Sequence, residues 1–139
     1  MGDARFRTVE LARIADISQR QLQVWEEKRV VMASREGRVR LYTASQALLV
    51  IILAELRRRG LSFQRLRTLA ATLRQLLSDY RLHERAPVLG GFILTDGRQV
   101  YFADSQNKIC ELVSNFFRPI VCVNLADCLE RIEKQALLH

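Results

Sequence analysis

The sequence predicts an α+β protein in which a helix-rich N-terminal part is followed by a smaller unit of strands and helices. Two short amphipathic helices, near residues 8–15 and 18–28, are joined by a tight turn and followed by an arginine-rich β-ribbon. After Pro87 the pattern changes to β-rich runs around an Asp-Gly turn. These observations divide the chain into two predicted parts, residues 1–86 and residues 87–139.

Positive charge is concentrated in the first part. Residues 1–85 contain 17 Lys and Arg against 9 Asp and Glu, a net charge of +8, whereas residues 86–139 have a net charge of −1. Arginine supplies 19 of the 22 basic residues, and its planar guanidinium suits phosphates and base edges. The asymmetry favours a polyanion-binding part, although a solvated surface in a protein from an arginine-rich proteome would look the same.

The two first helices form a helix-turn-helix pattern. Thr8 is the expected N-cap of the first helix, and Ser18, with Gln21 three residues later, is the expected N-cap of the second. Asp16 between them tolerates the left-handed backbone of a tight turn. Leu22 and Trp25 form the apolar stripe of the second helix, so its other positions, mostly amides, are predicted to face outward.

A β-ribbon follows the second helix. Val30–Met32 is the expected first strand and residues 39–42 the second, with Glu36-Gly37 as the turn between them. Alternation along the second strand places Arg38 and Arg40 on one face, and Arg35 adds a third arginine to the ribbon.

Two longer helices come next. Thr43 and Gln46 form a capping box for a strongly apolar helix that ends in three arginines and Gly60. Ser62 caps a further helix with apolar residues three and four apart. The first half of this stripe is expected to pack on the preceding helix, and the second half to pair with another subunit.

Beyond Pro87 the predicted order is β-β-α-β-α. Asp96-Gly97 between two β-rich runs indicates a hairpin, Ser105 begins a helix, and residues 120–125 and 125–138 form a buried strand and a last helix. A unit this small exposes part of its sheet unless it packs on something, and a partner copy is the simplest candidate.

Three motifs spread over residues 7–70 carry a family resemblance. They are Trp25-Glu26 at the end of the second helix, the ribbon pattern Arg35, Arg40 and Tyr42, and the segment LRRRGLSFQRLR. Together they resemble the DNA-binding domain of MerR-type transcriptional regulators. The resemblance implies a winged helix-turn-helix whose second helix enters the major groove and whose ribbon, the wing, contacts phosphates.

The resemblance assigns roles to the outward-facing residues. Glutamine pairs with adenine, and arginine with guanine or phosphate; the opposing interpretation is an ordinary solvated surface. Tyr42 either reaches a phosphate or is a core residue. The expected DNA-binding residues are Ser18, Gln19, Arg20, Gln21, Gln23, Lys28, Arg35, Arg38, Arg40 and Tyr42.

The chain departs from the family at four places. Gln21-Leu22-Gln23 stands where the family usually has Thr-Leu-Arg, and Val39 replaces a usual aromatic residue in the wing. Arg29 and Asp16 stand where glycine is common. These departures bear on the operator sequence and the phosphate contacts rather than on the fold.

MerR-type proteins usually dimerise through a long antiparallel helix, but little helix length remains here before Pro87. The dimer could form through residues 73–84, through the C-terminal unit, or through both. The expected contacts on the helix are Leu73, Leu76, Leu77 and Tyr80.

The predicted function is a cytoplasmic bacterial transcriptional regulator that binds a near-palindromic promoter site as a homodimer, with RNA polymerase as a further partner implied by the family. The alternative is a protein-interaction or small-ligand sensor module in which DNA binding is secondary. Enzyme chemistry, a cofactor and a membrane span are not expected, because the sequence shows no nucleophile beside a base, no phosphate loop and no apolar run long enough. No metal site is expected, because Cys110, Cys122 and Cys128 each lie in apolar surroundings without a nearby ligand.

Overall fold

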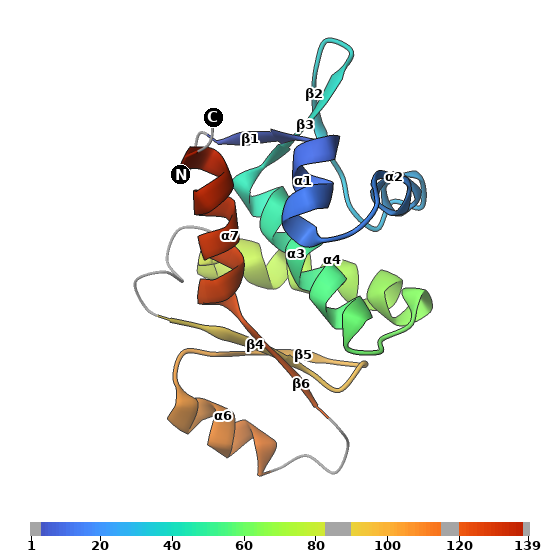
Figure 1. Ribbon diagram of the computed structural model, residues 1–139. Coiled ribbons are helices and arrows are strands. Elements are labelled where there is room, and N and C mark those ends of the chain that lie inside the picture. The colour runs from blue at the N-terminus through green and yellow to red at the C-terminus, as the bar shows by residue number, and fades with distance from the viewer. Residues whose placement is uncertain (1–3, 83–89, 115–119, 138–139) are drawn as a thin grey trace.

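The computed structural model describes residues 4–82, 90–114 and 120–137 and has the expected α+β architecture (Figure 1). Among these residues, no helix is long and apolar enough to cross a membrane. In chain order the elements are β1 (Arg5–Arg7), α1 (Thr8–Ala15), α2 (Gln19–Glu27), β2 (Ser34–Glu36), β3 (Val39–Thr43), α3 (Ala44–Arg58), α4 (Phe63–Tyr80), β4 (Phe92–Thr95), β5 (Val100–Ala103), α6 (Gln106–Val113), β6 (Val121–Asn124) and α7 (Leu125–Leu137).

The helix-turn-helix pair forms as predicted. Asp16 adopts the left-handed backbone (φ 57°, ψ 49°) that ends α1. Ser18 Oγ accepts a hydrogen bond from the Gln21 backbone N–H at 3.0 Å and so caps α2. Leu22 and Trp25 are 0% and 2% exposed, so α2 is fixed to its own domain by this stripe.

The start of α1 differs from the prediction. Its N-cap is Arg7, not Thr8, and the Arg7 N–H donates to Glu10 Oε1 at 2.9 Å. The cap lies one residue earlier because residues 5–7 form a strand that the sequence analysis missed. This strand pairs with β3 and buries Phe6 completely.

The first strand of the ribbon is also shifted. The strand predicted at residues 30–32 is wrong; the observed strand is β2, three exposed polar residues. It pairs with β3 in an antiparallel register that places Arg35 directly opposite Arg40. The resulting sheet has the order β1-β3-β2, with the β2–β3 ribbon projecting from the body of the molecule (Figure 1).

Val30 and Val31 instead form a buried linker after α2. Their N–H groups both point to the Trp25 carbonyl oxygen, at 2.9 and 3.4 Å, because Arg29 (φ 59°) turns the chain there. Their hydrophobicity therefore serves the core rather than a strand.

Helix α3 is the centre of the fold. The predicted capping box is present, with Gln46 N–H donating to Thr43 Oγ1 at 3.1 Å and Thr43 N–H donating to Gln46 Oε1 at 2.8 Å. Helices α1, α4 and α7 lie around α3 (Figure 1), and its residues from Ala47 to Ala54 are all buried. Gly60 (φ 105°) and the Ser62 cap then turn the chain into α4.

The second half of the apolar stripe of α4, like the first half, faces the core of its own subunit. Leu73 and Leu77 are 0% and 1% exposed and belong to the same core as α3, which corrects their expected place at a subunit surface. Leu76 is half-buried. The side chain of Tyr80 lies outside the described residues.

The C-terminal order β-β-α-β-α is observed as predicted. Gly97 (φ 91°) makes the β4–β5 hairpin turn, and Asp96 Oδ1 accepts hydrogen bonds from the N–H groups of Arg98 and Gln99 at 2.9 and 3.0 Å. Strand β6 pairs with β4, giving the sheet order β5-β4-β6.

This second sheet is covered by its own chain. Ile93 and Val123 lie on one face and join the buried cluster of α3, as do Leu129 and Ile132 of α7. This face of the sheet therefore does not need a partner copy to cover it, contrary to the expectation from the sequence. One continuous core spans both predicted parts.

Candidate nucleic-acid interface

The outer face of α2 presents the polar side chains that were expected there. Ser18, Gln19 and Arg20 are exposed, and Gln21 and Gln23 are half-buried. The buried stripe holds the opposite side of the helix, so this face is presented by a fixed element.

An open groove of about 410 Å³ lies between α2, the start of α1 and the ribbon. Gln19 and Gln23 both face it, because residues four apart share one side of a helix. The sequence-predicted residues Arg20 and Gln21 do not line this groove, nor does Arg35. Its lining residues are Arg7, Thr8, Val9, Gln19, Gln23, Arg38, Val39 and Arg40.

Arg38 and Arg40 of the ribbon supply cations to this groove. Arg38 is exposed, as is Arg35, which lies outside the groove lining. Arg40, opposite Arg35 in the register, is half-buried, and its Nε lies 3.1 Å from Glu26 Oε1 at the end of α2. Like charges directly opposite in a sheet are unfavourable, so the Glu26 carboxylate stabilises the arrangement.

Of the two alternatives for Tyr42, a phosphate contact or a core residue, the structure shows the core residue. It is completely buried, and its hydroxyl donates a 2.8 Å hydrogen bond to Glu26 Oε2. Burial, followed by the adjacent Glu26 carboxylate, raises the pKa of Tyr42 well above its usual range, so the hydroxyl stays protonated. The expected direct contact between Tyr42 and a phosphate is therefore corrected.

Four residues that line the groove were not expected there from the sequence: Arg7, Thr8, Val9 and Val39. The first three lie at the junction of β1 and α1, and Val9 and Val39 are 41% and 43% exposed. Glu26, which contacts Arg40, was noted only as part of a motif. The feature of the sequence that pointed to Glu26 was its place directly after Trp25, the tryptophan predicted to be buried.

Other predicted basic residues lie elsewhere. Lys28 is exposed at the C-cap of α2 and does not line the groove. At the end of α3, Arg58 donates to the Ala15 carbonyl at 2.8 Å and to Glu55 Oε2 at 2.7 Å. Arg59 also contacts Glu55, at 3.3 Å. Arg58 therefore joins α3 to α1, whereas Arg59, among the residues that the structure describes, pairs only with a carboxylate of its own helix.

The cysteines lie on α6, β6 and α7, and none of them lines the groove. Cys110 is exposed, whereas Cys122 and Cys128 line one cavity of about 300 Å³ that also includes Arg59 and Arg131. Burial raises the pKa of Cys128 to about 12 and raises the pKa of Cys122, so both thiols are neutral near pH 7. Among the described residues, no three His, Cys, Asp or Glu side chains could hold a metal ion together.

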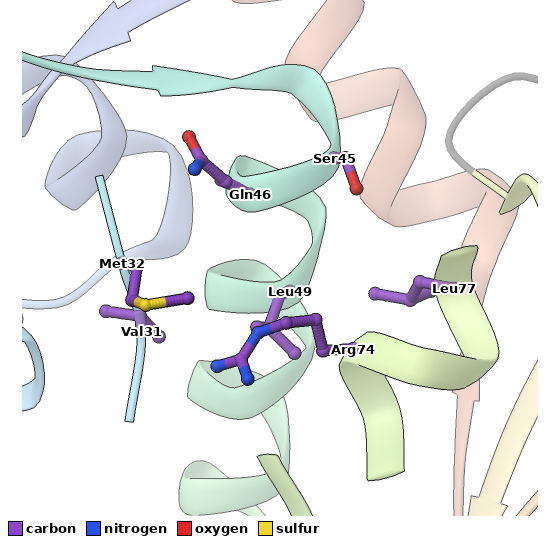
Figure 2. Close-up of a pocket in the computed structure, with 7 residues that line it drawn as sticks. All are labelled: Val31, Met32, Ser45, Gln46, Leu49, Arg74 and Leu77. Atoms are coloured by element: carbon purple, nitrogen blue, oxygen red, sulfur yellow. The ribbon is translucent and has the colours of Figure 1, made fainter. Parts of the chain in front are cut away.

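A second, smaller hollow lies behind the linker that follows α2. Figure 2 shows Leu49 of α3 and Leu77 of α4 beside this hollow of about 70 Å³, across from Val31 and Met32. Arg74 reaches over it from α4, and its Nη2 donates to the Val30 carbonyl at 3.1 Å. Helix α4 therefore holds the chain segment that joins α2 to the ribbon.

The comparisons place these features in a known family. Residues 6–73 match the family model described as MerR HTH family regulatory protein. No curated protein matches the chain. The matched range begins at the buried Phe6 of β1 and ends at Leu73 of α4, so it contains α2, the ribbon and the whole groove between them.

Proposed function

The chain belongs, through residues 6–73, to the MerR family of helix-turn-helix regulatory proteins, which bind DNA, and from this premise we propose that the groove face reads a near-palindromic promoter site. The observation that supports this proposal is that Gln19 and Gln23 of α2 line the same groove as Arg38 and Arg40 of the ribbon. Uncharged amides and guanidiniums in one place fit a duplex, which offers base edges flanked by phosphates.

The two elements have different tasks. Helix α2 reads base edges through its amides, because a glutamine amide pairs in a bidentate manner with adenine. The ribbon binds phosphates through Arg35 and Arg38, which are exposed, and through the terminal nitrogens of Arg40. Phosphate contacts set the register of the protein on the duplex and carry no sequence information themselves.

A near-palindromic site calls for two copies of this face, so the active form is a homodimer. With Leu73 and Leu77 in the subunit core, the C-terminal unit is the better supported route. Helix α6 has no buried residue: its Ile109 and Leu112 are half-buried and its Val113 is 44% exposed, and these three apolar side chains are the surface we propose for a second copy.

Dimer binding at a promoter brings the protein beside RNA polymerase in the bacterial cytoplasm. As the family resemblance implies, the dimer acts there by distorting promoter DNA. The cavity that holds Cys122 and Cys128 gives the C-terminal unit a place for a small effector, which keeps a sensor role within the same regulator.

Selection of bound duplexes from a random library tests this function. The full chain should enrich a single motif with two half-sites related by a two-fold axis. Sedimentation of the complex should then give two chains per duplex. Enrichment of no motif, or of a motif without symmetry by a single bound chain, would contradict the proposal.

A further inference from the structure

We propose that Glu26 is a positioning residue that locks the reading helix to the wing and thereby sets sequence specificity at the expense of general DNA affinity. This inference rests on the proposed DNA-binding function and assigns a role to a carboxylate within a face that binds a polyanion.

Both oxygens of the Glu26 carboxylate are engaged, and both partners come from β3. Oε2 accepts from the Tyr42 hydroxyl at 2.8 Å, and Oε1 lies 3.1 Å from Arg40 Nε. The Glu26 side chain is only 16% exposed. These two contacts join the last turn of α2 to the ribbon across 14 and 16 residues of sequence.

The position of this carboxylate needs an explanation. Glu26 lies in the last turn of α2, where the helix dipole disfavours negative charge, and close to a surface where a negative charge repels DNA. The neighbouring Glu27 is exposed and shares both disadvantages. What distinguishes Glu26 is the charged hydrogen bond from Arg40 and the buried hydroxyl of Tyr42, which stays protonated and can only donate to it.

The contact with Arg40 determines where that guanidinium points. Because Nε is held by Glu26, the terminal nitrogens remain for the groove, which Arg40 lines together with Gln19 and Gln23 of α2. Without Glu26, Arg40 gains freedom and unopposed charge. Phosphate binding then becomes stronger for any sequence, while the amides of α2 lose their fixed distance from the wing.

The test uses Glu26→Gln, which keeps the shape of the side chain, with Glu27→Gln as the matched control for the loss of one charge. Each full-length variant is titrated with the duplex recovered by selection and with its scrambled version at several salt concentrations. For Glu26→Gln we expect about tenfold loss of the operator-to-scrambled affinity ratio. Affinity for scrambled DNA should rise, with a salt slope steeper by about one unit, the share of one phosphate.

For Glu27→Gln both duplexes should shift by the same factor, which leaves the affinity ratio unchanged. Tyr42→Phe, which removes only the hydroxyl, should lower the ratio in the same direction as Glu26→Gln without a change in salt slope. It also provides the decisive variant if Glu26→Gln does not fold. A purely structural role would weaken both duplexes in parallel with the loss of folded protein, as followed by circular dichroism.

The possible outcomes separate this inference from the function on which it rests. If the wild type fails to distinguish operator from scrambled DNA, the proposed function fails and the role of Glu26 fails with it. If the wild type discriminates and Glu26→Gln keeps the same affinity ratio as Glu27→Gln, the proposed function stands and the inference about Glu26 is overturned.

Discussion

At the scale of single residues, three positions other than glycine among those that the structure describes have a left-handed backbone: Asp16, Arg29 and Arg81. Asp16 was expected, because aspartate tolerates this conformation in turns. Arg29 stands where the family prefers glycine, and its positive φ explains that preference: a side chain with a Cβ is strained there.

Replacing Arg29 with glycine should therefore stabilise the protein. We expect Arg29→Gly to raise the free energy of unfolding by about 1 kcal/mol, because relief of left-handed strain exceeds the added chain entropy. Urea unfolding followed by circular dichroism measures the difference. Lys28→Gly is the matched control, since Lys28 has φ −84° and gains nothing from glycine. Equal destabilisation by both substitutions would contradict the strain argument.

Glu55 provides a pH-dependent contact. The hydrogen bond from Arg58 lowers the pKa of Glu55 below its ordinary 4.5, with further help from the charges of Arg58 and Arg59. A lowered pKa in the folded chain means that the stabilisation is present above about pH 4.5 and is lost as the pH falls through the folded value.

Glu55→Gln should consequently destabilise the protein at pH 7, by less than about 1 kcal/mol, and the gap from wild type should close in acid. Thermal melts between pH 7 and pH 3 measure the gap. Glu130→Gln, which breaks the exposed pair with Lys134 at 3.2 Å, should show little difference at any pH. A gap for Glu55→Gln that is constant across this range would argue against the ion pair as its cause.

At the scale of elements, the accuracy of the sequence analysis followed the range of the interactions that form each element. The caps at Ser18, Thr43 and Ser62 were predicted correctly because a cap is a contact over three residues. Strands β1 and β2 were missed or shifted, because three-residue strands are defined by pairing with β3 and not by their own composition.

In the candidate site, too, features set by local sequence were predicted and features set by long-range packing were not. The amides of α2 and the arginines of the ribbon could be predicted from helical and strand periodicity. The role of Glu26 and the burial of Tyr42 could not, since both depend on how β3 packs against the end of α2. For the same reason Arg38, exposed and in the groove, now serves as a better probe of phosphate binding than Arg40.

The ribbon and α2 should respond differently to substitution. Arg38→Ala should weaken binding to operator and scrambled duplexes by similar factors and reduce the salt slope by about one unit. Gln23→Ala should leave the slope unchanged and cost roughly 1–3 kcal/mol at the operator alone. Titrations of both duplexes at several salt concentrations separate the classes. A change of sequence preference in Arg38→Ala, with uniform weakening in Gln23→Ala, would reverse our assignment of the two elements.

At the scale of the whole molecule, the two parts predicted from composition share one core. Charge and the Pro87 boundary separated residues 1–86 from residues 87–139, but neither shows how α7 packs. In Figure 1, α7 lies along α3. Helix α7 also contacts α1, and its Leu129 and Ile132 belong to the common buried cluster. The C-terminal unit therefore contributes to the stability of the DNA-binding part.

Removing residues 87–139 should expose the side of α3 that α7 and the second sheet cover. We expect the fragment 1–86 to melt at a lower temperature than the full chain and to bind a hydrophobic dye, because α3 is buried on nearly all sides. Calorimetry and dye fluorescence make the comparison. A fragment that melts cooperatively at the temperature of the full chain would indicate two independent domains.

The central claim, that α2 and the ribbon form the face that reads DNA, is tested most directly by backbone amide chemical shifts of the full chain with and without the selected duplex. The largest changes should occur in α2, in the β2–β3 ribbon and at the junction of β1 and α1. The amides of the second sheet (β4, β5 and β6) should change least, since this sheet lies at the opposite end of the molecule from α2 and the ribbon (Figure 1). Changes concentrated around Cys122 and Cys128, with α2 unaffected, would contradict it.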